Sequence, residues 1–327
     1  MYTSIEGESV AVTGGAGFIG SNLVWAPSND NDVTVIDNLS TGRYRNISQL
    51  VDSGKVRFVR GTITDGALVR RCLRGVEYVF HEAAIPSVAR SVKDPVATNE
   101  ANITGTLVLL NAARSAKVKR FVYASSSSVY GDTEVSPKNE GLPPNPMSPY
   151  ALTKVASEYY CKMFHELHGL STVCLRYFNV YGPRQDPTSE YAAVIPRFIT
   201  GVLSRKPLTV FGDGNQTRDF TYVEDIVRAN VLAAESDAVG NINVAAGRAI
   251  SVNDLARTVM NLAGREVRIK YEPPNPGEIR HSLADISKAS KEFGYSPKYS
   301  LEEGLKRTID WLSKDRVYRR KAHDEDA

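Results

Sequence analysis

The sequence predicts an α/β protein built on a doubly wound parallel sheet. Its first half alternates short apolar runs with segments of helical pattern, which is typical of parallel strands buried on both faces. A glycine-rich turn, Gly14–Gly20, follows the first apolar run and opens the first helix. Strand–turn–helix units of this kind begin the sheet of Rossmann-type proteins. We therefore predict a Rossmann-type sheet, followed by a smaller C-terminal α/β domain.

Six segments of the first half are expected to form strands, because each is a short β-rich apolar run. They are Ser9–Thr13, Val33–Asp37, Val56–Arg60, Val76–His81, Arg120–Ser125 and Thr172–Tyr177. The clearest helical patterns are Val96–Ala116 and Tyr150–His168, where apolar residues recur three to four positions apart. Pro27 is expected to end the first helix after little more than two turns, because proline lacks the backbone N–H that a helix interior needs.

The second half of the chain mixes both element types. Ser251–Gly264 predicts a helix capped by serine and closed by glycine, and Ser300–Glu303 is a capping box that opens the last helix. Asp219–Glu235 again has the pattern of a strand followed by a helix. Because 327 residues are many for one core, we predict a nucleotide-binding domain over residues 1–178 and a second domain over residues 179–327. The chain is expected to return to the first domain around residues 219–245.

Composition excludes several classes of function. A net charge of +3 is too small to indicate a nucleic-acid partner, and no apolar run approaches the length of a membrane span. Cys72, Cys161 and Cys174 lie in apolar runs without the spacing of metal ligands or of a disulfide framework. No signal peptide is evident at the start. We predict a cytoplasmic protein with reduced core thiols and no metal, nucleic-acid or membrane partner.

The glycine-rich turn has the spacing of a dinucleotide site. Gly14, Gly17 and Gly20 let the backbone approach a pyrophosphate, which then lies at the N-terminus of the following helix. Asp37 lies twenty residues beyond Gly17, at the end of the second predicted strand, where a carboxylate can bind the adenine ribose. The same negative charge repels a 2′-phosphate. The sequence therefore predicts NAD rather than NADP, despite Arg43 nearby.

Tyr150 and Lys154 form a candidate catalytic pair. They lie four residues apart, so that both fall on one face of the predicted helix. A phenol has a pKa near 10 and is a poor base at neutral pH. A lysine ammonium one turn away and an oxidised nicotinamide nearby would both favour the phenolate. This pattern predicts a general base for a sugar hydroxyl, although Tyr and Lys also occur at this spacing on solvated helices.

Together these motifs resemble the extended short-chain dehydrogenase/reductase family and, within it, the UDP-hexose 4-epimerases. The similarity covers almost the whole chain. The segments that carry it are Thr13–Gly20, Asp37–Gly42, His81–Ala84, Ser125–Gly131, Tyr150–Lys154 and Arg176–Pro183.

The resemblance implies three sets of site residues. The catalytic residues would be Ser126, Tyr150 and Lys154. NAD would be bound by Gly14, Gly17, Phe18, Ile19, Gly20, Asp37, Asn38, Ser40, Thr41, Gly42, Ile63, Phe80, Ala83, Ala84, Asn102, Ser125, Tyr150, Lys154 and Tyr177. A UDP-sugar would be bound by Ser87, Ser126, Ser127, Tyr150, Asn179, Val194, Thr209, Phe211, Arg218, Arg280 and Ser282. The resemblance also implies a homodimer that packs the helices at 96–116 and 150–168 into a four-helix bundle.

The implied activity is isomerisation at carbon 4 of UDP-glucose and UDP-N-acetylglucosamine through a transient 4-keto sugar. Ser282 stands where epimerases restricted to plain hexoses carry tyrosine, so the N-acetyl group is expected to fit. A UDP-glucuronate 4-epimerase is the first alternative, because Ser126–Ser128 and Arg184 could bind a carboxylate. A sugar-nucleotide dehydratase is the second, disfavoured because Ser127 and Ser128 replace the acid–base pair of that branch. A non-catalytic NAD-binding scaffold is the third.

Two positions depart from the family pattern. Thr62 replaces an aspartate that usually meets the adenine, and Asn275 replaces an arginine that would contact the diphosphate unless Arg280 takes that part. Without the family resemblance, Arg218 beside Asp219 would be interpreted as a surface ion pair.

Overall fold

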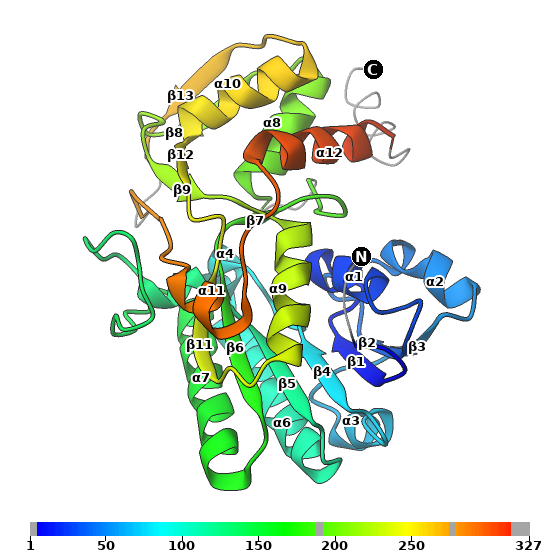
Figure 1. Ribbon diagram of the computed structural model, residues 1–327. Coiled ribbons are helices and arrows are strands. Elements are labelled where there is room, and N and C mark those ends of the chain that lie inside the picture. The colour runs from blue at the N-terminus through cyan, green and yellow to red at the C-terminus, as the bar shows by residue number, and fades with distance from the viewer. Residues whose placement is uncertain (1–4, 188–191, 275–278, 315–327) are drawn as a thin grey trace.

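A seven-stranded parallel sheet forms the centre of the computed structural model, which describes residues 5–187, 192–274 and 279–314 (Figure 1). The strand order is β11-β6-β5-β4-β1-β2-β3, and every neighbouring pair is parallel. The order reverses between β1 and β4, as in a doubly wound Rossmann-type sheet. The predicted fold class is confirmed.

The six predicted strands all lie in this sheet. They are β1 (Ser9–Thr13), β2 (Asp32–Asp37), β3 (Val56–Arg60), β4 (Tyr78–His81), β5 (Arg120–Ser126) and β6 (Thr172–Tyr177), joined at one edge by β11 (Gly240–Val244). Three of the predicted strands match in both bounds, and the others differ by one or two residues. Strand β11 was not predicted as such, since Gly240-Asn-Ile-Asn-Val244 carries only two strongly apolar residues.

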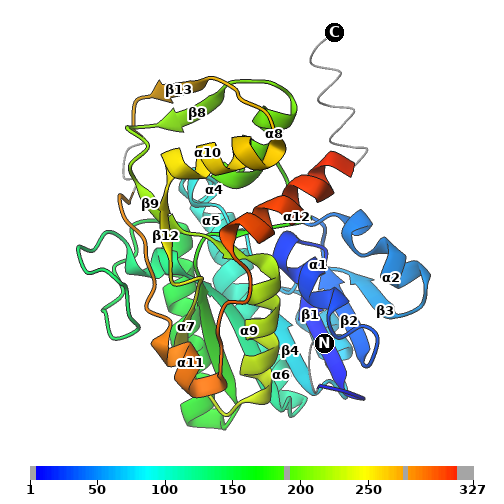
Figure 2. The same cartoon turned by 45° about the horizontal axis from the view of Figure 1, so that its top comes forward.

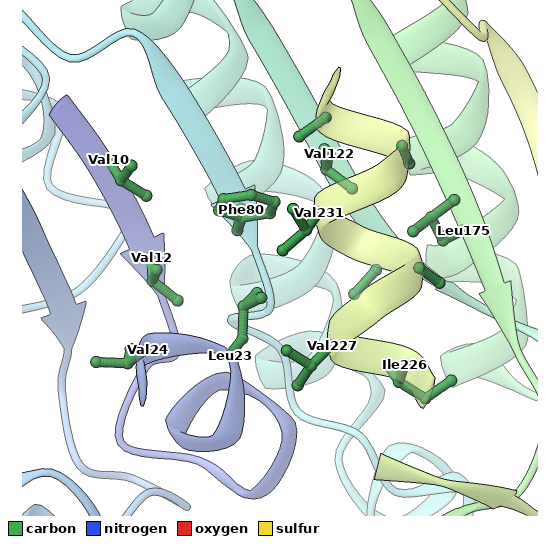
Figure 3. Packing of buried hydrophobic residues seen from close by; sticks show 14 of the residues in the cluster. Val10, Val12, Leu23, Val24, Phe80, Val122, Leu175, Ile226, Val227 and Val231 are labelled. Atoms are coloured by element: carbon green, nitrogen blue, oxygen red, sulfur yellow. The ribbon is translucent and has the colours of Figure 1, made fainter. Parts of the chain in front are cut away.

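Helices cover both faces of the sheet and bury separate apolar clusters. One face packs against α1 (Phe18–Trp25), α2 (Ser48–Asp52), α9 (Val223–Glu235) and α11 (Ser287–Phe293). The other packs against α3 (Gly66–Cys72), α6 (Gly105–Ser115) and α7 (Pro149–His168). Figure 3 shows Leu23 of α1 and Val231 of α9 reaching toward Phe80 on β4. The free thiols Cys72, Cys161 and Cys174 are buried in the second cluster.

Local signals place the ends of several helices. The Ser148 hydroxyl accepts the Ala151 N–H at 3.1 Å, and Pro149 occupies the first turn, so that α7 begins directly before Tyr150. Helix α1 spans only eight residues and ends at Trp25, as the proline two residues later predicts. Ser251 caps α10 (Val252–Ala263).

The helix predicted over Val96–Ala116 is present but not uniform. It consists of α5 (Pro95–Asn99), a π-helical turn at Glu100–Thr104 and α6, preceded by α4 (Val88–Lys93). Turns of this type inside α-helices occur frequently at functional sites. Here the turn carries the buried Asn102, whose contacts are described below.

A second unit lies beyond the carboxyl ends of the strands. Its apolar cluster joins α8 (Val194–Leu203), β8 (Leu208–Phe211), α10, β13 (Ile269–Glu272) and α12 (Leu301–Lys314). In Figure 2 the β8–β13 pair lies at the end of the molecule away from the large sheet. The short strands β7 (Val180–Tyr181), β9 (Thr217–Asp219), β10 (Thr221–Tyr222) and β12 (Ala249–Ser251) lead into this unit. The predicted capping box is present, with Ser300 and Glu303 exchanging bonds of 2.9 and 3.1 Å.

The boundary near residue 178 stays a prediction. After it has passed through β8 and β9, the chain does contribute β11 to the large sheet and α9 to one of its faces. Within the described parts of the chain, no helix has the length and apolar character needed to cross a membrane.

Candidate active site

Three adjoining cavities follow the carboxyl ends of the strands, where doubly wound sheets bind their ligands. The first, of about 370 Å³, opens at the glycine-rich turn. The second, of about 460 Å³, contains Tyr150 and shares Phe18, Ile19 and Pro86 with the first. The third, of about 280 Å³, lies in the second unit and shares Asn179, Val180 and Arg218 with the second. They form a continuous series from the sheet into the C-terminal half.

The first cavity is lined by most of the residues predicted to bind NAD. The predicted residues on its wall are Gly14, Gly17, Phe18, Ile19, Gly20, Asp37, Asn38, Ser40, Thr41, Ile63, Ala83 and Ala84. Glu82, Ile85, Pro86 and Ala101 also line it and were not predicted. Thr62 lines it too, in place of the aspartate usual in the family, and its hydroxyl bonds that of Thr64 at 2.9 Å.

The turn at Gly14 leaves no room for a side chain. Gly14 has a φ of +69°, and a Cβ on it would lie 2.6 Å from the Ala83 backbone nitrogen. A Cβ on Gly20 would lie 2.2 Å from the Gly14 carbonyl oxygen. These contacts bring the β1 turn, the start of α1 and the end of β4 together around an open cradle. The cradle fits a pyrophosphate at the N-terminus of α1.

Replacement of Gly14 by alanine is expected to abolish co-purification of NAD, because the new methyl group would push the Ala83 backbone into the cavity. The measurement is bound nicotinamide per protein chain after gel filtration. Gly54→Ala is the matched control: Gly54 also has a positive φ, +75°, but has nothing within 4 Å of an added Cβ. It should lose only about 1–2 kcal/mol of stability and keep its NAD. Equal NAD content in the two variants would contradict the close-approach argument.

Asp37, predicted to bind the adenine ribose, lies on the wall of this cavity. Its carboxylate accepts the Ala16 N–H at 2.9 Å and the Leu39 N–H at 2.7 Å. Burial raises the pKa of Asp37, and these two backbone bonds act in the opposite direction. Arg43, the basic residue nearest in sequence, forms an ion pair with Asp186. The arrangement fits an unphosphorylated ribose.

Three predicted NAD contacts lie behind the wall of the first cavity. Phe80 is a correction: its side chain packs in the core against α1 and α9 (Figure 3), whereas Glu82, just beyond the end of β4, lines the cavity instead. Asn102 is buried and holds the backbone of Ile85 through bonds of 2.8 and 3.3 Å. A Cβ on Gly42 would lie 2.9 Å from the Asp37 carboxylate.

The second cavity brings together residues that lie far apart in the sequence. Those predicted are Ser125, Ser126, Ser127, Tyr150, Tyr177, Asn179, Arg218 and Ser282. Lys138 and Gln185 also line it and were not predicted. Asn179 holds a φ of +30°, and strained backbone of this kind is enriched at functional sites.

Tyr150 faces this cavity from the first turn of α7. Its phenol is hydrogen-bonded to the Ser126 hydroxyl, which also accepts the Ser128 N–H at 3.2 Å. Burial raises the pKa of Tyr150, the Ser126 bond lowers it, and the negative charge of Glu82 raises it again. The sequence-based expectation, in which Lys154 and an oxidised nicotinamide favour the phenolate, includes neither this burial nor Glu82.

Lys154 lies behind Tyr150, buried against the sheet. Its Nζ donates to the Ala124 carbonyl at 2.6 Å and lies 5.8 Å from the centre of the Tyr150 ring. Burial lowers the pKa of Lys154 to about 8, while Glu82 and Glu158 act in the opposite direction. The ammonium is thus a positive charge held close beneath the phenol.

The third cavity contains the residues predicted to bind uridine and diphosphate. Asn179, Val194, Thr209, Phe211 and Arg218 line it, together with Gln216. The guanidinium of Arg197, a further lining residue, lies 5.7 Å from the centre of the Phe211 ring. A flat apolar slot beside an arginine suits a base and its diphosphate.

Two predicted substrate residues lie outside the second and third cavities, and the position that departs from the family pattern at Asn275 is not described. Ser87 caps α4 by accepting the Arg90 N–H at 3.2 Å. Arg280 pairs with Asp213 at 2.8 Å on the surface. Asn275 falls outside the described residues.

Asp219 is a buried residue that holds the walls of the site together. Its carboxylate accepts the N–H groups of Ala246, Gly247 and Ala284 at 2.9, 3.1 and 3.2 Å. Burial raises its pKa to about 6 against these bonds. It is therefore not the surface partner of Arg218 that sequence adjacency indicates.

Comparisons with known proteins agree with this geometry. Residues 10–245 match the model of the NAD dependent epimerase/dehydratase family. The UDP-glucose 4-epimerase of Mycolicibacterium smegmatis is 39% identical, covering 92% of this chain and 97% of the relative.

Two solved structures are also similar. One is a UDP-N-acetylglucosamine 4-epimerase from Methanobrevibacter ruminantium in complex with UDP-N-acetylmuramic acid, with a TM-score of 0.92, 42% identity and coverage of 94% and 99% of the two chains. The other is a UDP-glucuronic acid 4-epimerase from Bacillus cereus in complex with UDP-glucuronic acid and NAD, with a TM-score of 0.87, 36% identity and coverage of 94% and 99%.

Proposed function

The chain belongs to the NAD dependent epimerase/dehydratase family, and from this premise we propose that it is a UDP-sugar 4-epimerase that acts on UDP-N-acetylglucosamine and on UDP-glucose. One observation carries the proposal. Tyr150 lies in a cavity that adjoins a dinucleotide cradle on one side and a nucleotide slot on the other. A sugar linked to UDP in that slot would place its ring beside Tyr150.

The residues of the second cavity divide the chemistry at carbon 4. Tyr150 takes the proton of the 4-hydroxyl, and Ser126 holds the sugar oxygen and the phenol in one hydrogen-bonded line, since a hydroxyl both donates and accepts. Lys154 supplies the positive charge that stabilises the phenolate. NAD held in the first cavity would supply the group that accepts a hydride from carbon 4 and gives it back. The 4-keto sugar must turn over in between, so that the hydride returns to the opposite face of carbon 4 while the proton returns to the oxygen.

This cycle needs a firm hold on the nucleotide and a loose hold on the hexose. Phe211 and Arg218 supply the first, with an apolar wall and a guanidinium that matches phosphate oxygens. The cavity of about 460 Å³ beside Tyr150 supplies the second. Between turnovers NAD stays bound, because the reaction has no net redox change.

Ser282 supports acceptance of the N-acetyl group. Its small side chain lies on the wall of the second cavity, where a tyrosine would occupy the volume that an acetamido group requires. Its backbone N–H bonds the Thr217 carbonyl at 3.1 Å, which fixes its place beside the predicted diphosphate arginine.

Replacement of Ser282 by tyrosine is expected to lower turnover of UDP-N-acetylglucosamine at least about tenfold while UDP-glucose turnover is kept. The assay follows the glucose, N-acetylglucosamine and glucuronate series side by side, with Ser282→Ala as the control that removes the hydroxyl without filling the space. Unchanged turnover of UDP-N-acetylglucosamine by the tyrosine variant would contradict the pocket argument. Failure of the wild-type protein to epimerise any of the three would contradict the activity itself.

A UDP-glucuronate 4-epimerase is the second candidate, favoured by one observation. Lys138 is buried on the wall of the second cavity, where its Nζ donates to the Gly131 carbonyl at 3.1 Å. A buried ammonium there could bind a sugar carboxylate. Arg184, the residue considered for this role from the sequence, instead donates to Asn22 at 2.7 Å and lies over the Trp25 ring. Preferred turnover of UDP-glucuronate in the same assay would support this candidate.

A homodimer and a cytoplasmic location are also part of the proposal. Val92, Val96, Leu152 and Leu167 of α4, α5 and α7 have exposed fractions of 55% to 76%, which fits helices that pack against a second copy. The buried, unbridged cysteines fit a reducing compartment.

A further inference from the structure

Glu82 ends a chain of hydrogen bonds that points into the cofactor cavity. The Asn230 side-chain amide on α9 donates to the Tyr177 hydroxyl at 2.8 Å, and that hydroxyl donates to the Glu82 carboxylate at 2.8 Å. Tyr177 and Asn230 are buried, whereas Glu82 is partly open to the cavity that it lines. A carboxylate at the accepting end of such a chain is supported in its ionised form.

Four groups face Glu82 or lie next to it, and only one of them is a cation. Lys154, on α7, acts on Glu82 electrostatically, and each favours the charged form of the other. Tyr150, also on α7, has its pKa raised by Glu82. Tyr177, at the end of β6, donates a hydrogen bond, and burial lowers the pKa of the adjacent His81 to about 3, which keeps it neutral. Glu82 thus balances the charge of Lys154.

We propose that Glu82 is the counter-charge that stabilises the oxidised form of the bound cofactor and thereby favours return of the hydride to the sugar. The benefit to catalysis rests on the proposed function, whereas the position of Glu82 beside the cofactor cavity does not. Glu82 would then be a residue that tunes the cofactor, beyond the Ser126, Tyr150 and Lys154 set.

The charge balance of the reaction explains the effect. When carbon 4 is oxidised, its C–H bond and its O–H bond break and a C=O bond forms. The hydride joins the nicotinamide and cancels its positive charge, while the proton joins the Tyr150 oxygen and cancels its negative charge. Where Glu82 is ionised and Lys154 is protonated, the two keep opposite charges throughout. If the carboxylate were neutral, uncompensated Lys154 would destabilise the cationic, oxidised cofactor, and reduction would become easier.

An epimerase requires this balance more than a dehydrogenase does. The hydride must go back to the same sugar, so a site that favours the reduced cofactor would retain it and stall after release of the 4-keto sugar. Because burial raises the pKa of Glu82 to about 7 against the opposing effects of Tyr177 and Lys154, this counter-charge is present above that pH and is lost below it.

Glu82→Gln separates the effect of the charge from that of the hydrogen bond. Glutamine has nearly the size of glutamate, and its amide oxygen can still accept the hydrogen bond from the Tyr177 hydroxyl. The readout is a dye-coupled reductive titration of NAD bound to the purified protein, which needs no epimerase activity. Above pH 7, the constant for cofactor reduction is expected to be on the order of tenfold larger in Glu82→Gln than in the wild type. Below the pKa of Glu82 the two proteins should converge, since the wild-type carboxyl is then neutral as well.

Two further variants complete the test. Glu77→Gln removes a carboxylate just before the other end of β4, where it pairs with Lys119 at 2.6 Å, and should titrate as the wild type does. Tyr177→Phe removes the donor to Glu82, so the pH of convergence should move upward; this variant also serves if Glu82→Gln does not retain NAD. Identical reduction constants in wild type and Glu82→Gln across the pH range, or an unmoved convergence in Tyr177→Phe, would overturn the proposal. If the wild type and Glu82→Gln differ as expected in the constant for cofactor reduction but the protein epimerises no UDP-sugar, only the proposed function is refuted.

Discussion

Tyr150→Phe is expected to lower the epimerisation rate by about 10²–10⁴-fold while the protein remains folded and retains NAD. The substitution removes one oxygen, which is the atom that would accept the 4-hydroxyl proton and that bonds Ser126. The aromatic ring beside Lys154 and the wall of the second cavity stay in place. The loss should therefore appear in kcat with little change in the binding of UDP-sugar.

The control is Tyr159→Phe, the same change on the same helix at a side chain that is 53% exposed and lines none of the three cavities. Turnover, bound NAD per chain and UDP affinity by calorimetry are measured for both variants. If Tyr150→Phe turned over at the rate of Tyr159→Phe, Tyr150 would not be the base. If it lost NAD as well, the defect would be structural and the rate would say nothing about proton transfer.

The outline of the fold could be predicted because the signals for it are local. Buried parallel strands are short apolar runs, and the glycine turn, the Ser148 cap and Pro27 each act on a few neighbouring residues. The less apolar strand β11 carries no such signal, because its place in the sheet depends on pairing with β6. The π-helical turn at Glu100–Thr104 is also invisible to periodicity, which continues through it.

The parts of the site that sequence reasoning missed depend on contacts across long separations. Glu82 is 95 residues from Tyr177, and Asp219 is 65 residues from Ala284, so neither role is visible in a local motif. Lys138 lies in a loop whose pattern predicts no element, yet it reaches the second cavity. The assignment to Phe80 was wrong for a simpler reason. Phe80 packs in the core, and the side chain that lines the cavity is that of Glu82, two residues further along the chain.

The pKa of Tyr150 is a further property that the sequence alone does not predict. Its spacing from Lys154 predicts an attraction that lowers the phenol pKa, but spacing contains no measure of burial. In the structure, burial outweighs the neighbouring groups and raises the pKa of Tyr150. A working base at neutral pH therefore requires the positive charge of the oxidised cofactor in addition to Lys154. For the base proposed above, this would couple proton removal to the presence of NAD in its oxidised form.

Arg176→Met is expected to cost about 3–5 kcal/mol of unfolding free energy, the largest effect on stability that we predict, because it would leave Glu158 buried without its ion-pair partner. Arg176 Nε and Nη2 donate to the two carboxylate oxygens of Glu158 at 2.8 and 2.7 Å, and both side chains are almost fully buried. Ser125 and Asn241 donate to the same carboxylate at 2.6 and 2.9 Å. Urea unfolding monitored by circular dichroism gives the difference.

A second variant separates the loss of the ion pair from the cost of leaving Glu158 buried and unpaired. The double variant Arg176→Met/Glu158→Leu removes both charges, so it should recover much of the stability that Arg176→Met loses. Lys162→Met, which breaks an exposed pair with Glu166 on the same helix as Glu158, should unfold as the wild type does.

The double variant also removes a negative charge that supports protonated Lys154, so the pKa of Lys154 should fall below its wild-type value of about 8. On the alkaline side, activity would then decline at a lower pH than in the wild type even though the fold is restored. That result would show that the buried Arg176–Glu158 pair influences the charge of Lys154 next to Tyr150. An unchanged alkaline limit would show that it does not.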